Sequence, residues 1–177
     1  MVRNYRSNVL QAPITIAGYG RASKNKKVRS ACYNLFSIIN ESNHNLIEQY
    51  LEFEQKNPQL TPMEIIKQLA KKDQIAPISL AAYGRCSKNK KVKSICIKIY
   101  SEIAEQKYNI TQRYIRFEKE DPVLIPLEII EQIAKECNIA PITLAGYGRS
   151  SKDKHVKSEA IRVYNNLCDV GSQSVGA

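Results

Sequence analysis

The chain has 177 residues, of which 43% are hydrophobic and 7% aromatic, and its formal net charge at pH 7 is +10. This hydrophobic content suffices for a packed core and excludes disorder along the whole chain. The sequence has neither an apolar run long enough to span a bilayer nor the apolar segment of a signal peptide, so we expect an intracellular protein without a transmembrane segment.

The sequence repeats itself with a period of about 64 residues, and the copies align without insertion or deletion. Each copy has an Ala-Pro pair, with an Arg nine residues after the Ala: Ala12 and Arg21, Ala76 and Arg85, Ala140 and Arg149. Such a period is typical of tandem supersecondary units. We expect an all-α chain of about two and a half repeats, with a half repeat over 1–42, full repeats over 43–106 and 107–168, and a flexible tail over 169–177.

The first copy contains a short helix at Pro13-Ile14-Thr15-Ile16, preceded by too few residues to supply a partner helix. Three interpretations of this half repeat stay open. It is a cut from a longer array, a divergent cap, or an edge that pairs with another subunit, which would make the protein a homo-oligomer.

Helix start and stop signals divide the full repeats. Thr61 is predicted as an N-cap, with Pro62 at the first helical position and Glu64 completing a capping box; the equivalent helix spans 126–137. Helical spacing and Asp121-Pro122 predict another helix over about 110–120, with capping boxes at Asn109 and Gln112 and, one copy earlier, at Asn45 and Glu48.

Two further helices complete the repeat. A brief helix starts at Pro141 and is predicted to end at the glycines of Gly146-Tyr147-Gly148. Ser151 is then expected to cap a long helix through Leu167, whose inward face comprises Val156, Ala160, Val163, Tyr164 and Leu167. No segment predicts a strand.

The stretch "IIEQIAKECNIAPITLAGYGR" resembles the helix-turn-helix unit of bacterial repressors of the lac type. The resemblance rests on the small Ala134, the turn residue Asn138 and the core positions Ile139, Leu144 and Tyr147; copy two has Ala70, Gln74, Ile75, Leu80 and Tyr83. It covers about 40 residues per copy and implies a DNA-binding protein. Base readout is expected to be limited, because the positions that would project from the recognition helix are Ala140, Pro141, Ile142, Ala145 and Gly146.

The basic residues gather in three copies of one motif, YGRxSKxKxVKS, within 18–30, 82–94 and 146–158. These segments hold five, five and four basic residues and one Asp, a net charge of +13, so the remaining residues carry −3. Such clustering indicates a localised anionic partner.

We expect each motif to grip a phosphate through a helix start with unpaired N–H groups, an Arg, a Ser hydroxyl and lysines, the glycine before the Arg letting the backbone approach a ligand or turn sharply. Any sequence preference is assigned to small hydroxyl residues on the preceding short helix. The predicted contact residues are Arg21, Ser23, Lys24, Lys26, Lys27, Arg85, Ser87, Lys88, Lys90, Lys91, Arg149, Ser151, Lys152 and Lys154, with Thr15, Ser79 and Thr143 for sequence preference.

Duplex DNA is the leading partner, and RNA is not excluded. The alternative is a helical adaptor that docks an acidic protein or an anionic membrane through the same motif. Tyr19, Tyr83 and Tyr147 are interpreted as core contacts rather than base-stacking platforms.

Catalysis, metals and cofactors are not expected. The five cysteines form no C-x-x-C pair, and neither His44 nor His155 recurs in the other copies.

Overall fold

The structure is a computed structural model that describes residues 13–173, with side chains through Cys168. This part of the chain forms ten helices and no strand, which confirms the all-α prediction. None of these helices is both long and apolar enough to cross a membrane. The helices are α1 (Pro13–Gly20), α2 (Lys26–His44), α3 (Leu46–Lys56), α4 (Pro62–Lys72), α5 (Pro77–Gly84), α6 (Lys90–Tyr108), α7 (Ile110–Glu120), α8 (Pro126–Glu136), α9 (Pro141–Gly148) and α10 (Lys154–Gln173).

Several helix ends follow from local sequence. Thr61 caps α4 in a complete capping box with Glu64, as predicted, and Pro occupies the first position of α4, α5, α8 and α9. The tight turns before α5 and α9 place Gln74 (φ 55°) and Asn138 (φ 52°) in the left-handed region. The turn conformation therefore forms with Gln as well as with Asn.

Three other predicted caps lack the expected side-chain bond, although α3 and α7 begin directly after Asn45 and Asn109 as predicted. Asn45 and Asn109 make no side-chain capping bond, because each also ends the preceding helix with a left-handed φ of 44° or 47°. Ser151 does not cap α10; the Asp153 carboxylate accepts from the Val156 N–H. The helix α10 also continues past Leu167 to Gln173, so only 174–177 of the predicted flexible tail lie outside the described residues.

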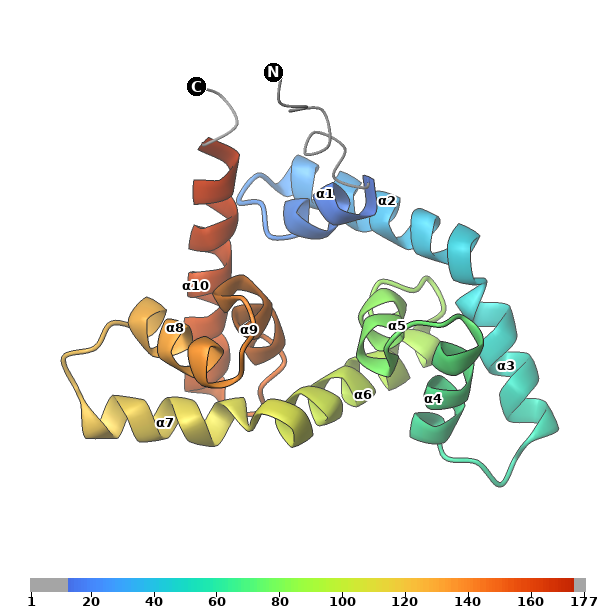
Figure 1. The fold of residues 1–177 in the computed structure, drawn as a ribbon. Coiled ribbons are helices and arrows are strands. Elements are labelled where there is room, and N and C mark those ends of the chain that lie inside the picture. The colour runs from blue at the N-terminus through green and yellow to red at the C-terminus, as the bar shows by residue number, and fades with distance from the viewer. Residues whose placement is uncertain (1–12, 174–177) are drawn as a thin grey trace, which may run out of the picture.

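The long helices α2, α6 and α10 follow one another around a triangle, with α3–α4 and α7–α8 at two corners (Figure 1). Each short helix packs on the long helix that follows it: α1 on α2, α5 on α6, and α9 on α10. The start of α1 and the end of α10 lie on the same side of the molecule. The fold is therefore a curved succession of helical units, which we call the first (α1 and α2), the second (α3–α6) and the third (α7–α10).

Aromatic side chains join successive units. Tyr147 stacks on Tyr108, with centroids 5.0 Å apart, and makes a tilted contact with Tyr100 at 5.7 Å. Tyr83 likewise stacks on His44 at 5.0 Å and meets Phe36 edge-on at 6.0 Å. These two tyrosines are packing residues, as predicted.

The first unit leaves residues exposed that the other units bury. Val28 and Leu35 are 45% and 46% exposed, whereas Val92 and Ile99, at the equivalent positions of the next copy, are 0% and 3% exposed. In the second unit α4 packs on α6. Within the described residues, α2 has no equivalent of α3 and α4 to cover it. The core-contact prediction fails for Tyr19, which is 39% exposed.

Candidate functional site: three basic junctions

The YGRxSKxKxVKS motifs form three junctions between a short and a long helix, and we call residues 21–27, 85–91 and 149–155 the basic junctions. Each begins with a backbone turn; in the second junction the Ser87 N–H donates to the Gly84 carbonyl at 3.0 Å. The serine hydroxyl then accepts from the N–H of the helix-capping residue, at 3.2 Å for Asn25 and Asn89 and 3.1 Å for Asp153. The loop is thus built by internal hydrogen bonds.

The helix starts are already capped. The Asn89 side-chain oxygen accepts from the N–H groups of Lys91 and Val92 at 3.0 and 3.1 Å, and Asn25 does the same one copy earlier. We expected unpaired N–H groups to hold a phosphate, and this expectation is wrong where the caps use them. Anion binding at these helix starts therefore depends on side chains and on the helix dipole.

The predicted serines lie under the surface. Ser87 and Ser151 are 9% and 5% exposed, and the Ser151 hydroxyl is 2.7 Å from that of Thr111. Ser23 is half-buried. All three hydroxyls support the loop, and those of Ser87 and Ser151 belong to buried residues.

The arginines lie half-buried against aromatic rings. The Arg21 Cζ is 3.8 Å from the centroid of Phe36, Arg85 is 4.2 Å from Tyr100, and Arg149 is 4.3 Å from Tyr164. Each ring is fifteen residues after its arginine. Sequence reasoning missed these partners, although aromatic residues at 36, 100 and 164 were a visible signal for them.

The lysines face outward. Within the junctions, the exposed lysines that form no ion pair with any described residue are Lys26, Lys27, Lys88, Lys90, Lys152 and Lys154. Lys24 is also exposed. Lys91 differs, because its Nζ pairs with Glu54 at 2.5 Å, and His155 makes the same contact with Glu118 at 2.7 Å. The structure therefore separates outward lysines from stacked arginines within one motif.

No acidic residue occupies the first turn of α2, α6 or α10. Lysines occupy these turns instead, where the positive end of the helix dipole disfavours them by about 0.3–1 kcal/mol each. An anion bound at these positions would attract the lysines and would interact favourably with the positive end of the helix dipole.

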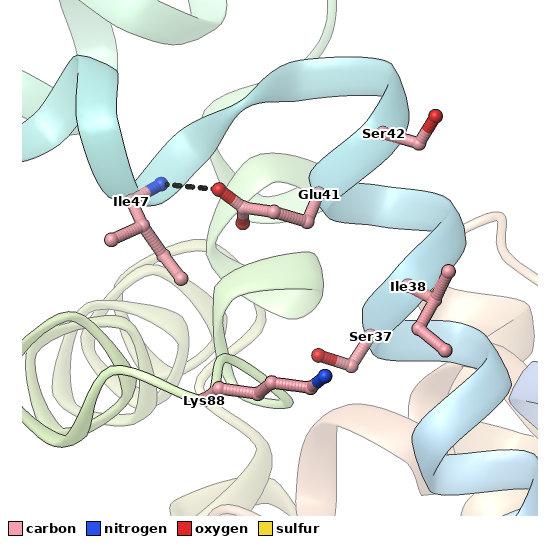
Figure 2. A pocket seen from close by; sticks show the side chains of 6 residues that line it. All are labelled: Ser37, Ile38, Glu41, Ser42, Ile47 and Lys88. Carbon is pink, nitrogen blue, oxygen red and sulfur yellow. Dashed lines mark hydrogen bonds between the residues drawn. The ribbon is translucent and has the colours of Figure 1, made fainter.

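Lys88 also borders a pocket of about 340 Å³ between the second junction and α2 (Figure 2). Lys88 points toward Ser37 in this view, and Glu41 accepts from the Ile47 N–H at 3.1 Å. The pocket thus combines one cation with a carboxylate that already supports the start of α3.

The three candidates for sequence preference lie on the short helices. Thr15 on α1 and Ser79 on α5 are half-buried, and Thr143 on α9 is exposed. Of the neighbouring positions, Ala145 is completely buried. Thr143 is therefore the most exposed of the three candidates for sequence preference.

Comparison with protein-family models, characterised proteins and solved structures finds no match to this chain.

Proposed function

We propose that the protein binds duplex DNA without catalysing a reaction, and that lysines at the starts of α2, α6 and α10 contact the phosphates. The supporting observation is that unpaired lysines recur at three helix starts where the dipole opposes them. Retaining the same unfavourable charge in three places is explained by an anionic partner.

Fewer residues are proposed to contact DNA than the motif contains. Lys91 and His155 already have carboxylate partners, and the serines and arginines are turned inward. The remaining lysines act as point charges on the sugar-phosphate backbone, which supplies affinity with little base readout.

The test is fluorescence anisotropy with a duplex of unrelated sequence at several salt concentrations. If about six lysines contact phosphates, the slope of log affinity against log salt is about −5, from roughly −0.9 per phosphate. Changing Lys26, Lys90 and Lys154 together to Gln should bring the slope to about −3. The matched control changes Lys67, Lys71 and Lys119, three exposed lysines outside the junctions, and should keep the original slope.

Absence of binding at low salt by the folded protein would reject DNA as the partner. A single-stranded RNA in the same titration tests the RNA alternative. Tighter binding of that RNA than of the duplex would also contradict the proposal.

A second candidate function is an adaptor for an acidic protein or an anionic membrane. It is favoured by the surface of α2, where Val28, Leu35 and Ile38 are each at least 45% exposed on the helix that starts with Lys26 and Lys27. Apolar side chains next to cations suit an amphipathic acidic partner better than bare phosphates. This candidate predicts binding with a shallow salt slope and no affinity for naked DNA.

A further inference from the structure

We propose that Arg21, Arg85 and Arg149 together form one binding site for a compact multivalent phosphate, with one ligand per chain. This site is distinct from the lysine surface and does not depend on DNA binding. Each of its arginines comes from a different junction, so the site exists only when the three units are assembled.

Contacts between units bring the three arginines toward one region. The Arg21 guanidinium leaves its own unit and donates to the Cys86 Sγ of the second junction at 2.9 Å. Its neighbour Ala22 packs against the core cluster of the third unit, which contains Tyr164. The first junction therefore touches the second junction and the core of the third unit.

A pocket of about 200 Å³ adjoins this region and has walls from all three units. The first unit contributes Ile14, Gly18 and Phe36, the second contributes Tyr83, and the third contributes Tyr164. Phe36 and Tyr164 are the rings on which Arg21 and Arg149 lie. Two of the arginines are thus held by the same rings that wall the pocket.

The cluster has no counter-charge. No carboxylate in the described residues forms an ion pair with any of the three arginines. Burial lowers the pKa of Arg85, and the positive charges of Arg149 and Arg21 lower it further. The positive charges of Arg149 and Arg21 thus both act on Arg85, and a multivalent anion would compensate this repulsion.

The chemistry of the arginines favours phosphate. Stacking on an aromatic ring uses the face of the guanidinium and leaves its edge for hydrogen bonds. Part of this edge is already used: Arg21 donates from Nε to the Gly18 carbonyl at 3.3 Å and from Nη1 to Cys86, and Arg85 bonds to Tyr100. A phosphate would accept from the remaining N–H groups. A planar edge with paired N–H groups matches two oxygens of one phosphate, and the rings limit the rotation of each side chain. A short polyphosphate offers several such oxygen pairs within a small volume.

The test is isothermal titration calorimetry of the full chain with inorganic triphosphate at constant ionic strength. We expect one ligand per chain. Arg85→Gln should weaken binding about tenfold or more, since a hydrogen bond to a charged group is worth at least that factor. Arg85→Lys should give intermediate affinity, because it keeps the positive charge and loses the planar, paired N–H groups of the guanidinium. Lys67→Gln is the control for loss of one exposed charge and should bind as the parent does.

Three equal sites per chain, no heat of binding, or equal affinity of Arg85→Gln and the parent would each overturn the inference. Circular dichroism at the titration temperature identifies a variant that does not fold, and Arg149→Gln then replaces Arg85→Gln. A parallel titration with a nucleoside triphosphate distinguishes a nucleotide from a free polyphosphate, and loss of either through Arg85→Gln supports the site.

One lysine variant distinguishes failure of the arginine site from failure of DNA binding. The variant of Lys26, Lys90 and Lys154 should still bind triphosphate while it loses duplex affinity. Loss of triphosphate binding in that variant would place the anion at the helix starts and contradict the arginine site.

Discussion

At the scale of single residues, two different cations make the same contact in successive units. Lys91 pairs with Glu54, and at the equivalent positions of the next copy His155 pairs with Glu118. The hydrogen bond that the His155 ring donates to the Glu118 carboxylate raises the pKa of His155 above its ordinary value near 6.5. Only the second pair therefore depends on pH in the neutral range.

We predict a small loss of stability between pH 5.5 and 8.5 from this pair. Because the folded state has the higher histidine pKa, the stabilisation is complete below about pH 6.5 and disappears as the pH rises through the folded-state pKa. Both side chains are largely exposed, so the expected change is at most about 0.5 kcal/mol. Urea unfolding at both pH values measures it, and His155→Lys, which reproduces the Lys91 pair, should remove this component.

In the part of the chain that the structure describes, two buried tyrosine hydroxyls have no hydrogen-bond partner. The Oη atoms of Tyr50 and Tyr114 are buried without a hydrogen bond, and both side chains are completely buried. Burial raises the pKa of Tyr50 to about 12. These hydroxyls cost free energy that a hydrogen bond would otherwise offset.

Tyr114→Phe should therefore raise the free energy of unfolding by about 1 kcal/mol, because it removes an unsatisfied polar group and keeps the ring. Tyr100→Phe is the comparison, since that hydroxyl has a hydrogen bond with Arg85, and it should lower stability. Chemical denaturation of both variants gives the two changes. Destabilisation by Tyr114→Phe would show that its hydroxyl has a partner in solution.

At the scale of helices, glycine sets how closely each short helix approaches the following long helix. Every described glycine has a negative φ, so none supplies a left-handed turn. A Cβ on Gly84 would lie 2.2 Å from the Cys96 Sγ, and a Cβ on Gly20 would meet Cys32 at the same distance. The glycine before each arginine thus permits helix contact, which corrects our expectation of ligand approach or a sharp turn.

We predict that Gly84→Ala destabilises the protein by about 1–3 kcal/mol through overpacking. Gly18→Ala is the control, because its Cβ would meet Phe36 at an ordinary 3.5 Å and the equivalent position is already Ala82. That control should be neutral or slightly stabilising, as Ala favours a helix over Gly. Thermal unfolding compares them, and Cys96→Ala should partly rescue Gly84→Ala.

At the scale of the whole molecule, equivalent residues have different roles according to their place in the succession of units. Leu35 is 46% exposed and Ile99 is 3% exposed, although they occupy equivalent positions of matching helices. The difference arises because α3 and α4 join α5 and α6 in one core cluster, and α1 and α2 lack such a pair within the described residues. Position in the array, rather than side-chain type, determines burial here.

Leu35→Lys should change the free energy of unfolding by less than about 0.5 kcal/mol, whereas Ile99→Lys should cost more than about 4 kcal/mol. Denaturant unfolding measures both. A large loss for Leu35→Lys would show that this surface is covered in solution, and sedimentation equilibrium would then test self-association. That outcome would support the interpretation of the half repeat as an edge that pairs with another subunit.

Local signals made most helices predictable from the sequence. The Thr61-Pro62-Glu64 box, the Asp121-Pro122 stop and the inward face of α10 all rely on residues within one or two turns of each other. The cap of α10 was misassigned because Ser151 and Asp153 both suit the position, and Thr111 lies against the serine. Local sequence could not choose between them.

The sequence by itself determined the all-α class, the apolar faces and the clustering of charge, since these depend on spacing along one helix or on composition. Tertiary structure alone decided that the arginines lie on aromatic rings while the lysines face solvent, and that the first junction contacts Cys86 of the second junction and the core of the third unit. That outcome depends on how each unit packs on the next through Tyr83 and Tyr147. Such packing joins residues far apart in the chain, so helical periodicity carries no information about it.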